Sequence, residues 1–401
     1  MKISNGVKIK SIREIKNLSG KIVFLRADLN VPIKGSKVLD DYKIVMILPT
    51  IRFLLRHNCR LVIATHLSDE KASTKPIAKR LAELLDRRVL FLKDCIGDKV
   101  NKAVRELKVK EVILLENLRF DQREEKNDKK FAKALAASAD IYVNDAFAVC
   151  HRNHASVSAI KKYLQGYAGL LLEKEILNLE KVLKPKQPLI SIMGGAKIET
   201  KIALLNNLAK KSERILIGGA LANNFIAAHG YKIGKSLVDK SSIALAAKLI
   251  KSHKNIILPV DVIVAKNISL AKLRQAGAVN SSKVQSRSVN KVEPNDVILD
   301  IGPRTVRLFA GFIREANTII WSGPLGFFED DHFKHGTLSI ARLVASRSTG
   351  RAFGVVGGGE TIEALKLTQM EQYVDWVSTG GGAMLAFLGG ENMPGLRGIV
   401  K

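Results

Sequence analysis

Lysines and glycines follow a short apolar run near the middle of the chain. Leu189–Met193 has the length of a strand, Gly194-Gly195 interrupts it, and apolar residues at helical spacing begin at Ile198. A strand, a glycine turn and a helix in this order leave backbone N–H groups uncovered at the helix N-terminus, which favours an anion. Lys197 and Lys201 are one helical turn apart, so both ammonium groups can face that turn. The alternative is an ordinary strand-to-helix connection with two solvated lysines.

Glycine-rich turns follow further strand-like runs in the second half of the chain, at Gly218-Gly219, Gly357–Gly359 and Gly380–Gly382. Glycine permits close approach of the backbone to a ligand, and a turn that opens a helix can cradle a phosphate. Glu360 places a carboxylate where a phosphate-bound Mg²⁺ needs an oxygen ligand. The alternative, that these are only tight turns, fits any single case but explains the group poorly.

The first half carries a different set of polar residues near the ends of predicted strands and in loops: Arg26, Asp28, Asn30, His66, Arg119, His151 and Arg152. Arginine holds carboxylates and phosphates through paired hydrogen bonds, so a small acid that carries a phosphate would suit this set. The alternative is that these arginines lie on the surface and cap helix ends.

Two other patterns do not predict a site. Gly230–Ser236 is one residue short of a P-loop, and a helix precedes it where a strand is needed. The pairs His151/His154 and His332/His335 have helical spacing but no adjacent acidic or thiol ligand, so we do not predict zinc.

Predicted strands and helices alternate along both halves of the chain. The first half contains strands near 21–26, 61–64, 89–92, 112–115 and 141–143, with helices between them, and the pattern restarts at residue 189. This alternation predicts an α/β fold with parallel sheets covered on both faces, whose ligands lie beyond the carboxyl ends of the strands. Residues 170–182 predict one long helix with no strand before it, which we interpret as a connector between two domains. Residues 266–296 are weakly patterned and could form small β excursions.

The composition is that of a globular protein with a basic charge. The chain has 401 residues, 46% of them hydrophobic, and 65 Lys and Arg against 38 Asp and Glu give a net charge of +27. Such a charge attracts anions, but the lysines are spread along the chain and aromatic residues are only 5%, so we do not expect nucleic-acid binding.

Cysteine usage and hydropathy indicate the compartment. Cys59, Cys95 and Cys150 form no closely spaced pair, which fits a reducing compartment. The N-terminus lacks an apolar signal core, and no apolar run approaches membrane-spanning length. We therefore expect a cytoplasmic protein without membrane association, and we expect a monomer.

Seven motifs resemble the signatures of the phosphoglycerate kinase family, in family order over essentially the whole chain. They are residues 23–32 (Val-Phe-Leu-Arg-Ala-Asp-Leu-Asn-Val-Pro), 115–120, 144–147 with His151-Arg152, 194–197, 321–324, 357–359 and 378–382. The resemblance implies two Rossmann-like domains with parallel sheets, joined by a long connector helix around a central cleft. The implied domains are 1–168, with a C-terminal tail of about 388–401 packed back on it, the connector 169–185, and 186–387.

The resemblance also implies an activity and its ligands. The first domain would bind 3-phosphoglycerate or 1,3-bisphosphoglycerate, and the second would bind ADP or ATP with Mg²⁺. The reaction would be reversible phosphoryl transfer from 1,3-bisphosphoglycerate to ADP, a step of glycolysis and gluconeogenesis, with hinge closure that excludes water.

Site residues are implied by matching positions. The substrate residues are Asp28, Asn30, Lys43, His66, Arg119 and Arg152, and the catalytic residues are Lys197 and Lys43. The nucleotide residues are Gly195, Lys197, Lys201, Gly219, Pro324, Glu329, Gly358, Gly359, Glu360, Thr361, Gly380, Gly381 and Gly382, with Glu360 as the metal ligand. Lys197 would lie nearest the transferred group, and Glu329 would reach the ribose.

The sequence departs from the family pattern at four positions. Lys43 replaces an arginine that steadies the transferring phosphoryl, and Asp69 replaces an anion-binding arginine in a shortened loop. Ser322 replaces an asparagine, and Glu360 replaces an aspartate. Two hypotheses follow: a working phosphoglycerate kinase, and a divergent paralogue that binds nucleotide with little kinase activity.

Overall fold

The chain folds into two compact α/β units. A computed structural model describes residues 8–196, 198–268 and 283–400. One unit comprises the chain up to Leu177 together with the segment from Asn392, and the other comprises Asn178–Glu391. The boundary between the units falls within α5 (Leu170–Leu183), the helix predicted as the connector.

The first unit is built on a six-stranded sheet in the order β5-β6-β4-β1-β7-β8. Its strands are β1 (Ile22–Ala27), β4 (Arg60–Ala64), β5 (Val89–Phe91), β6 (Val112–Leu114), β7 (Ile141–Asp145) and β8 (Gly166–Ala168). Every neighbouring pair is parallel. The carboxyl ends of these strands therefore meet at one edge of the sheet, as the alternation of strands and helices predicted.

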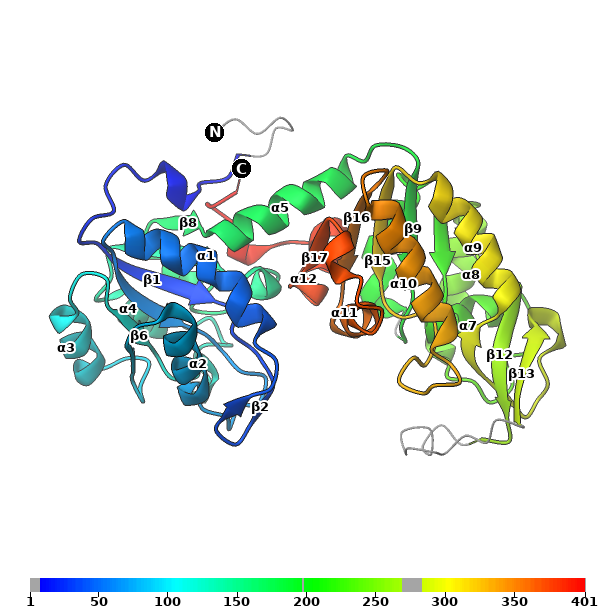
Figure 1. Ribbon diagram of the computed structural model, residues 1–401, viewed down its shortest axis with the longest axis horizontal. Coiled ribbons are helices and arrows are strands. Elements are labelled where there is room, and N and C mark those ends of the chain that lie inside the picture. The colour runs from blue at the N-terminus through cyan, green and yellow to red at the C-terminus, as the bar shows by residue number, and fades with distance from the viewer. Residues whose placement is uncertain (1–7, 197, 269–282, 401) are drawn as a thin grey trace. The chain divides into compact units, whose positions relative to one another are not determined.

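Both faces of this sheet are covered, because residues that alternate along each strand point to opposite sides. On one face Val23 and Leu25 join a core with α1 (Tyr42–Arg56) and α2 (Lys75–Leu85) (Figure 1). On the other face, Phe24 lines a small cavity together with residues of α3 (Asp98–Glu106) and α4 (Lys129–Ala136). A short hairpin of β2 (Ile33–Lys34) and β3 (Lys37–Val38) precedes α1.

The second unit is built on a parallel six-stranded sheet in the order β11-β10-β9-β15-β16-β17. Its strands are β9 (Leu189–Met193), β10 (Arg214–Ile217), β11 (Ile256–Ile257), β15 (Thr318–Ser322), β16 (Phe353–Gly357) and β17 (Trp376–Ser378). Numbered along the chain, this is the Rossmann order 3-2-1-4-5-6, so the strand order reverses between β9 and β15. Ligands bind at such a reversal point in open α/β sheets.

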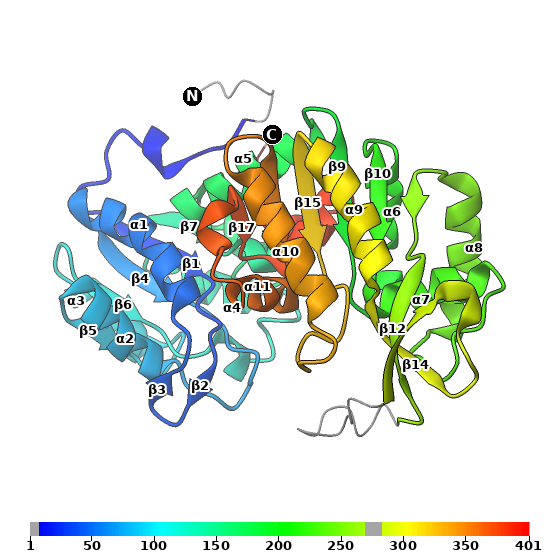
Figure 2. The ribbon, with the colours of Figure 1, turned by 45° about the vertical axis from the view of Figure 1, so that its right-hand side comes forward.

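Helices cover both faces of the second sheet. They are α6 (Ile202–Ala209), α7 (Gly219–Ala228), α8 (Ile243–Ser252), α9 (Pro303–Glu315), α10 (His335–Ser348), α11 (Gly359–Lys366) and α12 (Gly381–Leu388). Figures 1 and 2 show α9 and α10 side by side along one face, where Phe309 and Ile340 share a core with Trp321. Gly357 allows α12 to approach β16, since a Cβ there would lie 2.4 Å from the sulfur of Met384.

The weakly patterned segment belongs to a small antiparallel sheet in the order β13-β12-β14, formed by β12 (Asp261–Lys266), β13 (Val284–Ser288) and β14 (Asp296–Ile301). Part of the segment lies outside the described residues. None of the helices in the described ranges is long and apolar enough to cross a membrane.

Candidate functional site

The polar residues singled out in the first unit lie where parallel strands end. Asp28 follows β1, His66 follows β4 and Arg119 lies in the 3-10 turn Leu118–Phe120 after β6. Arg152 follows β7 and the 3-10 turn Phe147–Val149. Because the strands are parallel, these residues come to the same edge of the sheet. The structure thus brings together residues separated by more than a hundred positions in the sequence.

Lys43 reaches this edge from the first turn of α1. Its Nζ lies 2.7 Å from Oδ2 of the buried Asp28 and donates a hydrogen bond to it. Asn30 is held by Ser68, a partner that the sequence pattern does not reveal. Asn30 Nδ2 donates to Ser68 Oγ at 2.7 Å, and Ser68 N donates to Asn30 Oδ1 at 2.9 Å. Both ends of the Asn30 amide are therefore oriented by Ser68.

Four basic residues form a cluster of mutually repelling cations, called the cation cluster below: Arg26, Lys43, Arg119 and Arg152. Burial, followed by the positive charges of Arg26, Arg119, Arg152 and Lys43, lowers the pKa of His66 well below its ordinary value. Burial and Arg119 likewise lower the pKa of Arg152. His66 is therefore neutral at physiological pH, and the arginines supply the positive charge. An anion relieves this repulsion, so the edge is suited to a phosphate or carboxylate.

Two arginines of the region also form ion pairs with nearby carboxylates. Arg119 Nε lies 3.1 Å from Glu125 Oε1. Arg123 pairs with Asp121 at 2.6 Å, with its guanidinium over the ring of Phe131. Arg123 is therefore committed to local contacts.

The second unit contains a pocket of about 640 Å³ beyond the ends of β9, β10 and β15. Five predicted nucleotide residues line it: Gly195, Gly219, Pro324, Glu329 and Glu360. Gly219 has a φ of +62°, and a Cβ there would lie 2.6 Å from the carbonyl oxygen of Pro324. Glycine at this position lets the turns after β10 and β15 meet without a side chain between them.

Backbone hydrogen bonds hold the glycine turn after β9. Gly194 N donates to Ser322 O at 3.0 Å, and Gly195 N donates to Pro324 O at 2.8 Å. Both N–H groups therefore have backbone partners, one in Ser322 at the end of β15 and one in the turn that follows it. The predicted anion contact at the helix N-terminus that comes next stays a prediction. The helix begins later than predicted: a 3-10 turn at Glu199–Lys201 precedes α6, which starts at Ile202.

Lys201 is buried beside this turn and its Nζ donates to the carbonyl oxygen of Gly194. Burial lowers the pKa of Lys201 to about 8, and the nearby charge of Glu360 opposes that fall. Lys197, predicted to lie nearest the transferred group, lies outside the described residues.

The two remaining glycine turns converge at the N-termini of α11 and α12. A Cβ at Gly381 would lie 3.3 Å from the Cα of Gly358, so the two turns touch. Gly358 and Gly359 begin α11, while Gly380, Gly381 and Gly382 begin α12. The first N–H groups of a helix have no partner within the helix, so both termini are suited to a phosphate. The predicted contacts of these residues with phosphates stay predictions.

Thr361 is completely buried, and its hydroxyl accepts a hydrogen bond from Gly323 N at 2.7 Å. Its oxygen therefore supports the turn after β15. The predicted phosphate contact of Thr361 stays a prediction.

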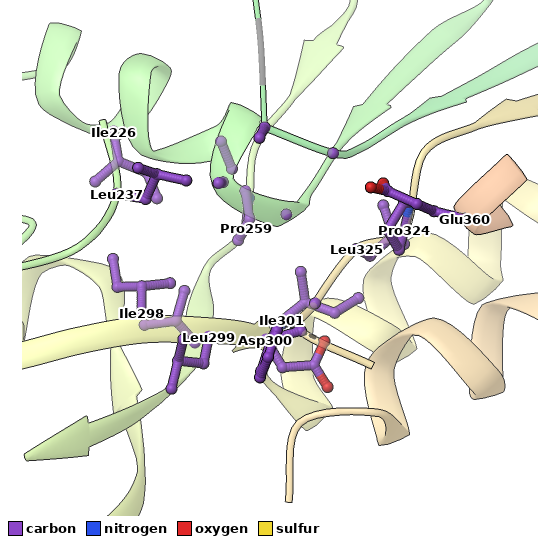
Figure 3. Close-up of a pocket in the computed structure, with 18 of the residues that line it drawn as sticks. Ile226, Leu237, Pro259, Ile298, Leu299, Asp300, Ile301, Pro324, Leu325 and Glu360 are labelled. Carbon is purple, nitrogen blue, oxygen red and sulfur yellow. Dashed lines mark hydrogen bonds between the residues drawn. The ribbon is translucent and has the colours of Figure 1, made fainter. Parts of the chain in front are cut away.

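Apolar side chains form the other end of the pocket and were missed by the sequence analysis. Figure 3 shows Ile226, Leu237, Ile298 and Leu299 grouped at one end, with the carboxylate of Glu360 at the other. A slot with an apolar end and a polar end suits a flat base attached to a charged phosphate chain. Nothing in the sequence distinguishes these apolar residues from core residues.

A divalent cation is compatible with the polar end. Glu360 contributes a carboxylate oxygen, which Mg²⁺ prefers, and Mg²⁺ commonly takes its other ligands from phosphates and water. Within the described ranges no group of three or more His, Cys, Asp or Glu could hold a metal ion by itself. Glu360 therefore fits an ion that arrives with a nucleotide.

A parallel α/β fold in two units, one with a slot at glycine-rich strand ends and one with clustered cations, defines the class of two-domain α/β kinases. The family model described as phosphoglycerate kinase matches residues 12–391. The chain belongs to the phosphoglycerate kinase family, which confirms the resemblance seen in the sequence.

Relatives match over nearly their whole length. The chain is 40% identical to the phosphoglycerate kinase of Pelotomaculum thermopropionicum over 402 residues, covering 98% of this chain and 99% of the relative. It is 42% identical to that of Moorella thermoacetica over 395 residues, covering 96% and 97%. Among solved structures, the phosphoglycerate kinase of Coxiella burnetii superposes with a TM-score of 0.84 at 35% identity, covering 98% of this chain and 99% of the other.

Proposed function

We propose that this protein transfers a phosphoryl group reversibly from 1,3-bisphosphoglycerate to ADP, giving 3-phosphoglycerate and ATP. The observation that carries the proposal is the cation cluster at one edge of the first sheet. The family match over residues 12–391, which reaches into both units, supports it. No finding favours a paralogue without kinase activity, since the relatives named phosphoglycerate kinase match nearly the full length of the chain.

The first unit binds the three-carbon acid in this proposal. Arg119 and Arg152 neutralise its phosphate, and the low pKa of His66 makes that residue a neutral hydrogen-bond donor or acceptor. Lys43 holds Asp28 and supplies the positive charge next to it. Asn30, oriented by Ser68, contributes a directional contact to the substrate.

The second unit binds the nucleotide. The apolar end of the slot takes the base, Glu329 takes the ribose, and the helix N-termini at Gly358 and Gly380 take the phosphates. Glu360 would hold Mg²⁺, which would neutralise charge on the phosphate chain. Lys201 adds a cation whose desolvated ammonium gains strength from the low local dielectric. Phosphoryl transfer needs such positioning and charge neutralisation, and little covalent chemistry from the protein.

The test is formation of ADP from Mg-ATP that depends on 3-phosphoglycerate, with a coupled step that removes the acyl phosphate. We expect robust turnover that Lys197→Ala abolishes. Lys210→Ala is the matched control, because Lys210 is an exposed lysine at the end of α6. Absent turnover with intact ADP binding by calorimetry would contradict the proposal and favour a nucleotide-binding protein. A monomer in the cytoplasm stays a prediction.

A further inference from the structure

A network of hydrogen bonds between buried polar side chains lies behind the cation cluster of the first unit. Arg26 is completely buried, its Nε donates to Ser156 Oγ at 2.8 Å, and its Nη2 lies 3.3 Å from His66 Nδ1. Ser156 Oγ lies 2.6 Å from Oε1 of Glu124, which is also completely buried. A second bond joins Ser156 N to Glu124 Oε2 at 2.9 Å.

The direction of each hydrogen bond in this network follows from which groups carry a donor proton. Arginine has only donors, so Ser156 Oγ must accept from Arg26 Nε. The single hydroxyl proton of Ser156 is then available for Glu124, which accepts it. For the same reason Nδ1 of His66 must accept from Arg26 Nη2. The proton of a neutral His66 therefore resides on Nε2.

We propose that Glu124 and Ser156 are positioning residues, which act through Arg26 to hold His66 as the neutral tautomer with its proton on Nε2. This proposal rests on the function proposed above and assigns His66 a definite role in it: a fixed donor to an oxygen of the phosphoglycerate. Neither Glu124 nor Ser156 needs to touch the substrate for this purpose.

The surrounding charges agree with this arrangement. Arg26, Arg119, Arg152 and Lys43 all disfavour a positive charge on His66, so the ring stays neutral. His154 faces the same cluster at 3.9 Å from Glu124 Oε1, and burial followed by Arg26 lowers its pKa to about 4. Burial raises the pKa of Glu124, while the charge of Arg26 and the hydrogen bonds from Ser156 lower it, so Glu124 is the buried carboxyl that opposes the charge of Arg26.

The test combines a spectroscopic readout with kinetics. With ¹⁵N-labelled histidine, two-dimensional NMR distinguishes a protonated Nε2 from a protonated Nδ1, and His66→Gln assigns the signal. We expect wild-type His66 to be the neutral Nε2–H tautomer at pH 7. Ser156→Ala should give a mixture of tautomers and raise the KM for 3-phosphoglycerate about tenfold, while the KM for ATP changes less than about twofold.

Two further variants separate positioning from general damage. Ser158→Ala is the matched control, because Ser158 lies two residues away and its side chain makes no cap hydrogen bond at the adjacent 3-10 turn. It should leave both readouts unchanged. Ser156→Thr keeps the hydroxyl and should restore the tautomer.

Several outcomes would overturn the proposal. They are a protonated Nδ1 or an imidazolium in the wild type at pH 7, a raised KM in Ser156→Ala with an unchanged tautomer, and an equal effect of Ser158→Ala. A protonated Nδ1 or an imidazolium in the wild-type spectrum would overturn the proposal even where Ser156→Ala does not fold. Failure of the proposed kinase function would instead appear as absent turnover with the Nε2–H tautomer intact.

Discussion

The ammonium of Lys43 lies 2.7 Å from the carboxylate of Asp28, and the two side chains differ in burial. Asp28 is 5% exposed at its side chain, whereas Lys43 is 28% exposed. The carboxylate is thus covered and depends on Lys43 for a counter-charge, while part of the lysine side chain stays exposed. Lysine supplies this charge with a single ammonium, where an arginine would supply a planar fork.

Removal of this charge should weaken the acceptor site. Lys43→Met leaves a buried carboxylate unpaired beside the substrate, so kcat/KM for 3-phosphoglycerate should fall about 100-fold, equivalent to roughly 3 kcal/mol. Lys43→Arg keeps the charge and should retain turnover. Steady-state kinetics with both substrates make the measurement, with ADP affinity by calorimetry as the control. An unchanged KM for 3-phosphoglycerate and an unchanged kcat in Lys43→Met would contradict the assignment of Lys43.

Asp69 should hinder binding of the acid by electrostatic repulsion. It is exposed, and its carboxylate accepts a hydrogen bond from Lys71 N at 2.9 Å. Asp69→Arg should lower the KM for 3-phosphoglycerate about three- to tenfold at low salt, and the gain should shrink as salt screens it. Glu106→Arg makes the same charge change at an exposed position on α3. Equal effects of the two substitutions would show that only net charge matters.

The sequence predicted both parallel sheets because their strands and helices alternate clearly. It left β13 undefined, since Val284–Ser288 is mostly polar and its pairing with β12 is a tertiary contact. A site at Asp28, His66 and Arg119 could be predicted, because each follows a strand and ligands bind beyond the carboxyl ends of parallel strands. Their mutual electrostatic effect, however, needed the structure.

The hydrogen bonds of Gly194 and Gly195 could not be predicted for a related reason. Their partners, Ser322 and Pro324, lie about 130 residues later in the chain. A local pattern of strand, glycines and helix suggests free N–H groups, and only the contact with the end of β15 and its following turn shows that these two N–H groups are bonded. The apolar end of the nucleotide slot could not be predicted either. Leu237 and Leu299 are residue types common in any core, so nothing in the sequence marks them as pocket residues.

The pKa of Lys201 predicts a pH dependence of nucleotide binding. Burial lowers it to about 8, so the ammonium loses its proton as the pH rises through about 8 in the free protein. A neutral amine attracts phosphates less, and affinity for ADP should therefore fall between pH 7.5 and 9.5. Lys201→Arg keeps its charge over this range and should give a flatter profile. Calorimetric titrations of both proteins make the measurement, and parallel profiles would contradict the role of Lys201.

The lowered pKa of the Lys201 ammonium also predicts how the free energy of unfolding depends on pH. The pKa of Lys201 is about 8 in the fold, below the 10.5 of an unhindered lysine, so the unfolded state binds more protons between these values. The free energy of unfolding should rise with pH from about 8 to about 10.5, by up to roughly 3 kcal/mol from this group. Denaturant unfolding of the wild type against Lys201→Met measures the difference. A wild-type pH dependence no steeper than that of Lys201→Met would contradict it.

Thr361 ties the N-terminus of α11 to the turn after β15. Its hydroxyl accepts from Gly323 N at 2.7 Å, and both residues are buried. Thr361→Val removes the acceptor at nearly constant volume and leaves that N–H without a partner, which should cost about 1–3 kcal/mol of stability. The same turn carries Pro324, whose carbonyl oxygen binds Gly195, so a displaced turn should also raise the KM for ATP. Thr361→Ser keeps the hydroxyl and should behave like the wild type in both measurements. If Thr361→Ser loses as much stability as Thr361→Val, the methyl group matters and the hydrogen bond does not.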